Sequence, residues 1–354
     1  MANSYRSICL LPILADSVVV IDEVHSFDKP MFSALKKFLK HFQVPVLCMT
    51  ASLPENRKRD LEECGLDVFP QSITEFDDLH AVAGMDRYRV LRVDPSVCFT
   101  LAQAALAEKK RVLWVVNTVK RCQDMARNLQ ALCYHSRFKL IDRKGKHQKV
   151  VSAFRPIGDP ILALTTQVCE MSLDLDADVL ITEAAPITSL IQRMGRCNRH
   201  ARPGDKQLGQ VYIYDPEDWN PYKKEELAGL QLFLEDIHNQ KLSQSKLQCL
   251  LELYGPGEVE VERYAAFLEC GLWADSREDT FRDEREFTVQ ALLDCDIDPY
   301  LKMRRSKKNI DGFLLPVPRK FARLDTRVGR YPFIAPSSHY HPDYGFLDHP
   351  LEDK

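Results

Sequence analysis

Short runs of apolar residues recur along the first 215 residues, and stretches with helical periodicity separate them. The runs are continuous rather than alternating, which is typical of parallel strands buried on both faces. The predicted strands cover residues 18–21, 44–49, 112–116, 161–164, 179–181 and 211–214. The predicted helices include residues 31–42, 56–64, 96–109 and 119–132. Strand and helix in alternation predict an α/β fold with a parallel sheet.

Two breaks in this pattern divide the chain into three predicted parts. Residues 67–85 are polar and poorly periodic, as a linker would be, and a second boundary follows Asp215-Pro216. Beyond it the periodicity becomes helical, and the chain ends in a charged stretch and a tail rich in Pro, Tyr and His. We therefore expect domains at 1–85 and 86–216 and a mainly helical C-terminal region at 217–354.

Composition narrows the classes of protein that this fold could represent. The net charge of −3 excludes a generally basic, DNA-coating protein, so any nucleic-acid surface must be a local patch. The 11 cysteines form no Cys-x-x-Cys pair and no set with zinc spacing, which fits a reducing compartment. No stretch approaches the ~20 apolar residues of a membrane span. We expect a soluble, cytoplasmic protein.

Polar clusters follow four of the predicted strands, where a parallel sheet places its ligands. The clusters are Asp22-Glu23, Thr50-Ala51-Ser52, Asn117-Thr118 and Thr165-Thr166-Gln167. In a nucleotide hydrolase, the first carboxylate of such a pair would hold the phosphate-bound Mg²⁺ and the second would orient the attacking water. Each cluster taken alone could equally cap the helix that follows it.

Residues 191–199 carry three arginines in seven positions, Arg193, Arg196 and Arg199, together with Gln192 and Gly195. Such a set is costly to bury and excessive for a solvated helix. A planar guanidinium matches a phosphate, and arginines stabilise the charge that develops in phosphoryl transfer. The upstream segment 164–178 offers hydroxyls for a nucleic-acid backbone and carboxylates for a ribose or an arginine. That segment could also be a polar capping loop.

In their order, these segments resemble the motifs of superfamily 2 helicases. Residues 22–25 (Asp-Glu-Val-His) resemble motif II, 50–52 motif III, 112–118 motif IV, 165–178 motif V and 192–199 motif VI. Residues 21–28, 172–178 and 192–199 are similar, more narrowly, to the CRISPR-associated helicase-nuclease family, as are 134–138 with Asp142-Arg143. The resemblance covers residues 15–215 well and the remainder weakly.

The resemblance implies two RecA-like lobes, the first truncated and the second complete, and it implies roles for individual residues. Catalysis and the Mg²⁺ of bound ATP would involve Asp22, Glu23, His25, Arg196 and Arg199, with Asp22 and Glu23 as the metal ligands. ATP would contact Gln192, Gly195, Arg196 and Arg199, and its ribose Asp174. Thr50, Ala51 and Ser52 would couple hydrolysis to nucleic-acid grip. The DNA backbone would contact Thr118, Arg137, Thr165 and Thr166.

Two parts of that family are missing from the sequence. No Gly-x-x-x-x-Gly-Lys-Ser/Thr phosphate-binding loop occurs, and only 21 residues precede Asp22. No His-Asp dipeptide marks a nuclease domain; His339, His341 and Asp343 we place in an exposed tail rather than in a metal site. We expect the chain alone to hydrolyse ATP poorly or not at all. It would be a gene fragment, or a split subunit whose partner chain carries the loop.

Three functions remain open at this stage. The first is an ATP-dependent DNA helicase or translocase of a CRISPR antiviral system, working on single-stranded DNA with an effector complex. The second is a catalytically incomplete module that binds single-stranded DNA or the effector. The third is a superfamily 2 helicase of another pathway. The basic run 302–308 would contact the translocating strand, or it would be a solvated face.

Overall fold

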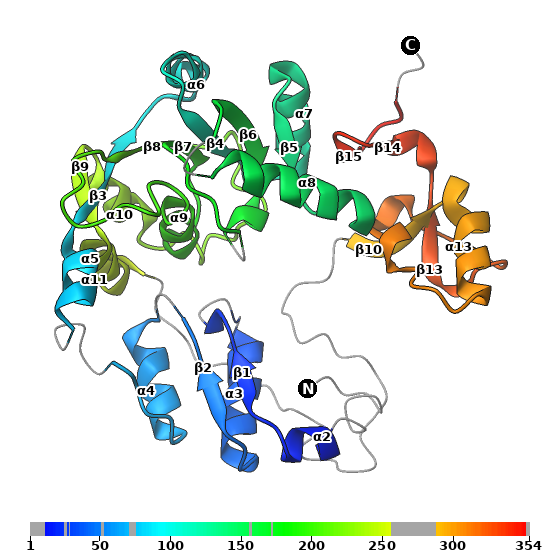
Figure 1. The fold of residues 1–354 in the computed structure, drawn as a ribbon, viewed down its shortest axis with the longest axis horizontal. Coiled ribbons are helices and arrows are strands. Elements are labelled where there is room, and N and C mark those ends of the chain that lie inside the picture. The colour runs from blue at the N-terminus through cyan, green and yellow to red at the C-terminus, as the bar shows by residue number, and fades with distance from the viewer. Residues whose placement is uncertain are drawn as a thin grey trace. The chain divides into compact units, whose positions relative to one another are not determined.

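The structure is a computed structural model, and it describes residues 11–24, 27, 29–50, 53–70, 76–155, 158–170, 173–255 and 288–351. The chain forms two compact units that divide between His80 and Ala81, inside the stretch that the sequence indicates as a linker. Figure 1 shows the elements of both units. Each unit is described by itself below.

The first unit contains a two-stranded parallel sheet. The strands β1 (Val19–Ile21) and β2 (Val46–Cys48) pair in register from Val19 opposite Val46 to Ile21 opposite Cys48. Its helices are α2 (Leu11–Ala15), α3 (Lys29–His41) and α4 (Glu55–Glu63). Helix α5 (Asp77–Gly84) crosses the boundary between the units. The small core consists of Val24, Phe32, Leu35 and Leu61.

One face of this small sheet exposes apolar side chains. Val18, Val20, Leu47 and Met49 are 67, 55, 51 and 41% exposed, whereas Ile21 and Cys48 pack against the core. Because alternate residues of a strand point to opposite faces, these four side chains lie on the same face of the sheet. Parallel sheets normally bury both faces. Among the described residues, this sheet therefore leaves the face of these four side chains largely exposed.

The second unit is built on a larger sheet. Among the described residues, seven strands follow the order β5-β6-β4-β7-β8-β3-β9, all parallel except β9, which pairs antiparallel with β3. The strands β4 and β7 at its centre are buried along their whole length, as their continuous apolar sequences predict. The strands are β3 (Asp86–Arg92), β4 (Arg111–Val115), β5 (Leu132–Tyr134), β6 (Ile161–Thr165), β7 (Val179–Glu183), β8 (Gly209–Tyr214) and β9 (Gln240–Ser243).

Helices cover both faces of this sheet, and each face has its own apolar core. On one face α6 (Cys98–Ala107) and α7 (Val119–Leu129) pack against β4 and β7. The other face carries α8 (Leu140–Ala153), α9 (Ile187–Met194), α10 (Leu230–Ile237) and α11 (Gln244–Tyr254) (Figure 1). The prediction of an α/β fold with parallel sheets is confirmed.

The second lobe extends beyond the boundary that we expected at residue 216. Strand β9 forms the edge of its sheet, and α10 and α11 contribute Phe233, Ile237 and Leu247 to its main core. The apolar periodicity that predicted helices after residue 216 is therefore the pattern of helices that cover this sheet. Residues 217–254 pack with the second lobe.

The expectation of a mainly helical C-terminal region is wrong for residues 288–351. Here β10 (Thr288–Leu293), β11 (Leu315–Pro318), β12 (Arg323–Asp325) and β13 (Gly329–Ala335) form a sheet in the order β11-β10-β13-β12, with α13 (Ile297–Arg305) beside it. Proline or charge interrupts β11, β12 and β13, and Gln290 interrupts β10, so these sequences lack the apolar runs of buried strands. Ala291, Leu293, Leu315 and Val317 are nevertheless buried in a separate core.

The Pro/Tyr/His-rich tail is folded, contrary to our expectation of an exposed one. It forms a hairpin of β14 (Tyr340–His341) and β15 (Gly345–Phe346). His339 stacks on Phe346, and the Nζ of Lys146 lies 2.7 Å from the Oδ1 of Asp343. In the part of the chain that the structure describes, no His/Cys/Asp/Glu cluster could hold a metal ion. Nor is any helix there long and apolar enough to cross a membrane.

Candidate functional site

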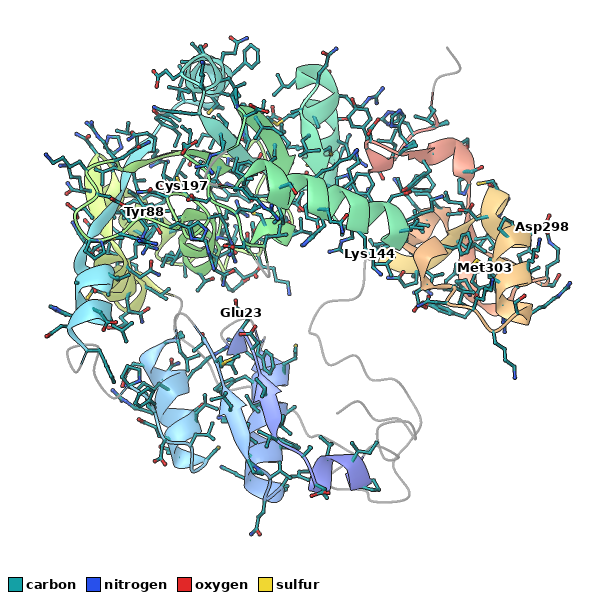
Figure 2. All side chains as sticks on the ribbon, in the orientation of Figure 1. Glu23, Tyr88, Lys144, Cys197, Asp298 and Met303 are labelled. Carbon is teal, nitrogen blue, oxygen red and sulfur yellow. The ribbon has the colours of Figure 1, made fainter. Side chains whose placement is uncertain are left out.

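The acidic pair lies at the carboxyl end of β1, as its sequence predicts. Asp22 is exposed and Glu23 is half-buried, and Figure 2 shows Glu23 just past the end of the strand. The backbone N–H of Glu23 donates to Oδ1 of Asp22 over 2.9 Å. Glu23 has a φ of 55°, a conformation that non-glycine residues seldom adopt and that occurs often at functional sites. The carboxylates are thus held at a strand end by an unusual local backbone.

The end of β2 is tied to this pair through the backbone. The N–H of Met49 donates to the carbonyl of Ile21 over 2.8 Å, and the N–H of Val24 donates to the carbonyl of Met49 over 3.2 Å. These bonds bring Thr50, which is exposed, beside the acidic pair. His25, Ala51 and Ser52, which we also assigned to this site, lie outside the described residues.

The donor set at the end of β1 fits an Mg²⁺ ion that arrives with a nucleotide. Mg²⁺ prefers oxygen ligands, keeps several waters, and in nucleotide sites takes one or two carboxylates in addition to the phosphates. Asp22 and Glu23 supply such carboxylates from adjacent positions. The pair does not amount to a metal cage of its own, which agrees with a metal carried by ATP.

In the second lobe, Asp174 and Arg199 come together. The Nε of Arg199 lies 2.9 Å from Oδ1 of Asp174, and the side chains are 40% and 64% exposed. The backbone N–H of Arg199 donates to the carboxylate of Asp176 over 2.7 Å, which holds the backbone of Arg199 in place in the segment that follows α9. An exposed ion pair adds little stability, so Arg199 can exchange this partner for a phosphate at low cost. Gln192 and Gly195, both half-buried, lie at the end of α9.

Arg196 is not on the surface where we expected it to meet a phosphate. It is 7% exposed, and its Nη1 and Nη2 donate to the carbonyls of Leu173 and Glu170, each over 2.6 Å. Carbonyls in an irregular buried loop need donors, and a guanidinium supplies several in one plane. In this conformation Arg196 is bonded to the carbonyls of Glu170 and Leu173, and a role on the nucleotide would require it to leave them.

Two of the four residues expected to contact DNA are buried. Thr165 and Thr166 are 1% and 2% exposed, and the hydroxyl of Thr165 donates to the carbonyl of Thr166. In the structure these two side chains do not reach the surface, so a contact with DNA phosphates, which stays a prediction, would require them to become exposed. Thr118 is half-buried and caps α7, its hydroxyl accepting from the N–H of Arg121 over 3.3 Å.

Arg137 also differs from its expected role on DNA. Its side chain is 16% exposed, and its Nη1 lies 3.0 Å from Oδ1 of Asp348. The neighbouring segment binds the C-terminal hairpin as well: His135 and Gln123 contact the carbonyl of Tyr344 over 3.0 and 2.7 Å. The charge of Arg137 is thus neutralised by an acid nearly at the end of the chain, which its local sequence could not indicate.

A buried polar network behind these residues was missed by the sequence analysis. It is centred on Arg193, which is fully buried and whose Nε donates to Glu170 over 2.8 Å. Burial alone would lower the pKa of Arg193, but the charge of Glu170, its hydrogen bond and the neighbouring Tyr222 and Cys169 together outweigh burial, and the pKa is raised. A nearby carboxyl, Glu183, has its pKa raised by burial, against the opposing influence of the N–H of Asn117 and of Arg121. The only sequence signal was an extra arginine inside an apolar helix.

Comparisons with known proteins agree on one group. Residues 108–202 match the family described as CRISPR-associated nuclease/helicase Cas3, C-terminal. The chain is 34% identical over 337 residues to the putative CRISPR-associated nuclease/helicase Cas3 of Myxococcus xanthus, covering 92% of this chain and 44% of the relative. The chain thus spans less than half the length of this curated relative.

Solved structures show the same fold at low sequence identity. The crystal structure of T. fusca Cas3-ADP is similar with a TM-score of 0.67 and 17% identity, over 94% of this chain and 53% of that one. A chain of a CRISPR RNA-guided surveillance complex, pre-nicking, is similar with a TM-score of 0.65 and 20% identity, over 91% and 54%. These likenesses confirm the prediction of RecA-like lobes.

Proposed function

We propose that this chain, which belongs to the Cas3 family of CRISPR-associated nuclease/helicases and matches part of their length, forms part of an ATP-dependent DNA helicase or translocase of CRISPR defence. Its first unit would be the C-terminal portion of one RecA-like lobe. Residues 81–254 would be the other lobe, and residues 288–351 an accessory domain. Its partners would be single-stranded DNA and a CRISPR effector complex, in the cytoplasm.

The observation that carries this proposal is the meeting of Asp174 and Arg199, 2.9 Å apart, at one end of the second lobe. The two residues are separated by a strand and a helix in the sequence, yet each belongs to a segment that resembles a helicase nucleotide motif. A guanidinium that is held by a weak, exposed partner is suited to a phosphate. The nucleotide of the T. fusca relative supports ATP as the ligand.

The residues of this chain would divide the work as follows. ATP with its Mg²⁺ supplies the phosphoryl group that is transferred to water. Asp22 would hold the Mg²⁺ that is bound to the phosphates, and Glu23 would accept the proton of the water that it orients. Arg199 would offset the negative charge on the phosphates, and Asp174 would turn to a ribose hydroxyl.

Mixing experiments test this proposal. ATP hydrolysis is measured for the 354-residue chain alone, and then with the polypeptide encoded directly upstream of it, each with and without a single-stranded oligonucleotide. We expect hydrolysis that DNA stimulates in the mixture and little in the chain alone. No hydrolysis in any mixture, with DNA binding retained, would instead support a second candidate.

That second candidate is a module that binds DNA or the effector complex without turnover. The sequence observation that favours it is the lack of a Gly-Lys-Ser/Thr phosphate-binding loop in the 354 residues. Such a loop cradles the β- and γ-phosphates with backbone N–H groups and is a major source of ATP affinity. In this case the oligonucleotide binds with the same affinity whether ATP is present or not.

A further inference from the structure

Arg193 is the most completely enclosed charge in the described part of the second lobe, with a relative exposure of 0%. Its Nε donates to Oε1 of Glu170 over 2.8 Å. Its Nη1 donates to the hydroxyl of Thr182 over 2.9 Å and to the carbonyl of Glu183 over 3.1 Å. Its Nη2 donates to Oδ1 of Asn117 and to the hydroxyl of Tyr222, each over 3.0 Å. All five N–H donors of the guanidinium are therefore used.

These acceptors come from four separate places in the lobe. Asn117 follows β4, Thr182 and Glu183 end β7, Glu170 lies in the loop after β6, and Tyr222 belongs to the segment before α10. The side chain of Arg193 is thus a single point at which the carboxyl edge of the sheet, the 167–178 loop and α9 are joined.

The 167–170 segment is held to this point from several sides. The second carboxylate oxygen of Glu170 accepts from the hydroxyl of Ser189 over 3.1 Å, and its carbonyl accepts from Arg196 over 2.6 Å. The side-chain amide of Gln167 donates to the carbonyl of Asn117 over 2.8 Å and to the hydroxyl of Tyr222 over 3.2 Å. Arg193 and Gln167 therefore share both Asn117 and Tyr222, and the network closes on itself.

A stable core alone does not require such a charge. Burying an ion pair costs so much hydration that apolar side chains of similar size often stabilise a fold as well or better. Instead, the five donors of a planar guanidinium hold their acceptors in one defined arrangement. The network therefore indicates that this part of the lobe must keep one fixed geometry.

We propose that Arg193 is a positioning residue: it fixes the 167–170 segment against α9 and thereby sets the positions of Arg196, Asp174 and Arg199. Tyr222 completes this arrangement from outside the helicase-like segments. The proposal rests on the proposed function in one respect, that the 165–178 loop and the 192–199 segment serve DNA and ATP. It adds that the two sites communicate through one buried guanidinium.

Two variants test the arrangement, each with a matched control. Arg193→Lys keeps the charge but offers a compact ammonium in place of the planar fork. Tyr222→Phe removes one hydroxyl and no charge, and it keeps the test decisive if Arg193→Lys does not fold. The controls are Arg92→Lys, which alters an ion pair with Asp215, and Tyr254→Phe, which removes the hydroxyl that donates to Asp236.

The first measurement is amide hydrogen exchange of the full chain, followed by mass spectrometry. In both variants we expect exchange in peptides covering residues 165–176 to accelerate by about tenfold or more, because the loop opens more often. Peptides covering residues 288–301 should be unaffected, as should both regions in the controls. Exchange in residues 165–176 at the wild-type rate, in variants that fold, would overturn the proposal.

The second measurement separates positioning from a merely structural role. In the same mixture that is assayed for hydrolysis, the affinity for a fluorescent ATP analogue is measured with and without a single-stranded oligonucleotide, and the ratio of the affinities gives the coupling between the sites. In Tyr222→Phe we expect this ratio to fall by about fivefold or more towards one, with the midpoint of thermal unfolding nearly unchanged. If the ratio of affinities in Tyr222→Phe equals that of the wild type, the proposed communication between the sites is wrong. A ratio of one in the wild-type chain overturns the proposed function, and the exchange rates then decide the role of Arg193.

Discussion

Arg193 is the residue whose replacement we expect to cost the most stability. In Arg193→Gln the carboxylate of Glu170, which is 9% exposed, loses its buried partner. Removing one member of a buried ion pair costs about 3–5 kcal/mol, because the other charge stays buried and unpaired. Urea denaturation should show this loss in the free energy of unfolding. Arg92→Gln breaks a half-exposed pair with Asp215 and should cost about 1 kcal/mol or less.

Arg199 should behave in the opposite way. Its side chain is 40% exposed, and its partner Asp174 is more exposed still, so Arg199→Ala should change the free energy of unfolding by about 0.5 kcal/mol or less. Affinity for an ATP analogue should fall by about tenfold, because a charge-assisted contact to a phosphate is lost. Titration of the fluorescent analogue against both proteins measures this. Equal affinities would remove Arg199 from the nucleotide site.

The local sequence predicted where the candidate residues lie along the chain, but it did not predict their exposure or their partners. Asp22, Glu23, Asp174 and Arg199 lie at strand ends or loop ends, where the pattern predicted them. Whether a side chain in such a segment faces solvent depends on residues far along the chain. Arg137 meets an acid 211 positions later, and no local pattern could indicate that partner.

At the scale of secondary-structure elements, the ion pair at the amino end of β4 can be tested by varying the pH. The side chain and backbone N–H of Arg111 donate to Asp178 over 2.8–2.9 Å. Burial alone would raise the pKa of Asp178, but these bonds and the positive charge outweigh it and hold the pKa below its ordinary value. A depressed folded pKa stabilises the fold above the unfolded value, and this contribution is lost as the pH falls through the folded pKa.

The variant Asp178→Asn should therefore be less stable than the wild type near pH 6. The difference between their midpoints of thermal unfolding should shrink as the pH falls from about 4, where the unfolded carboxyl begins to take up a proton, through the lower pKa of the folded carboxyl. Circular dichroism melts at a series of pH values measure it. A difference that does not change with pH would mean that the charge of Asp178 contributes nothing.

The accuracy of the element predictions followed the strength of the apolar pattern. The six predicted strands correspond to β1, β2, β4, β6, β7 and β8, because buried parallel strands read as continuous apolar runs. Strand β3 was missed because Asp86, Arg87, Arg89 and Arg92 interrupt its apolar residues at an edge of the parallel portion. Strand β5 begins at Leu132, where the predicted helix 119–132 was expected to end, and β9 has one apolar residue, Leu242, among its four.

At the scale of the whole molecule, the basic run at the C-terminal end of α13 can be tested as a surface for DNA. Lys302, Arg304, Arg305, Lys307 and Lys308 are all exposed, and of these Arg304 donates to the carbonyl of Val328. If the other four cations contact phosphates, replacing them with Gln weakens binding of single-stranded DNA. The slope of log affinity against log salt should then become shallower by about 0.7 per contact.

Fluorescence anisotropy with a labelled oligonucleotide, at several salt concentrations, measures both effects. The control replaces the exposed Lys223 and Lys224 with Gln and should leave the slope unchanged. If the variant of the basic run keeps the wild-type affinity and slope, that run is a solvated face.

The domain plan stays a prediction from sequence, and the two units of the structure divide between His80 and Ala81, near the expected boundary at residue 85. The linker before the second unit is polar over many residues, so composition marks it. The expected boundary at residue 216 marks only the end of the parallel strands. Helices α10 and α11 cover the sheet of the preceding lobe, and periodicity shows that a helix has an apolar face without showing which core it covers.

The central claim is that Asp22 and Glu23 belong to an ATP-hydrolysing site. It is tested most directly by the rate of DNA-stimulated ATP hydrolysis in the chain combined with its upstream polypeptide, comparing the wild type with Glu23→Gln. Gln keeps the size of the side chain but cannot accept the proton of water, so we expect hydrolysis to fall to the background level. Glu63→Gln, an exposed change on α4, should keep full turnover. Wild-type turnover in Glu23→Gln would contradict the account.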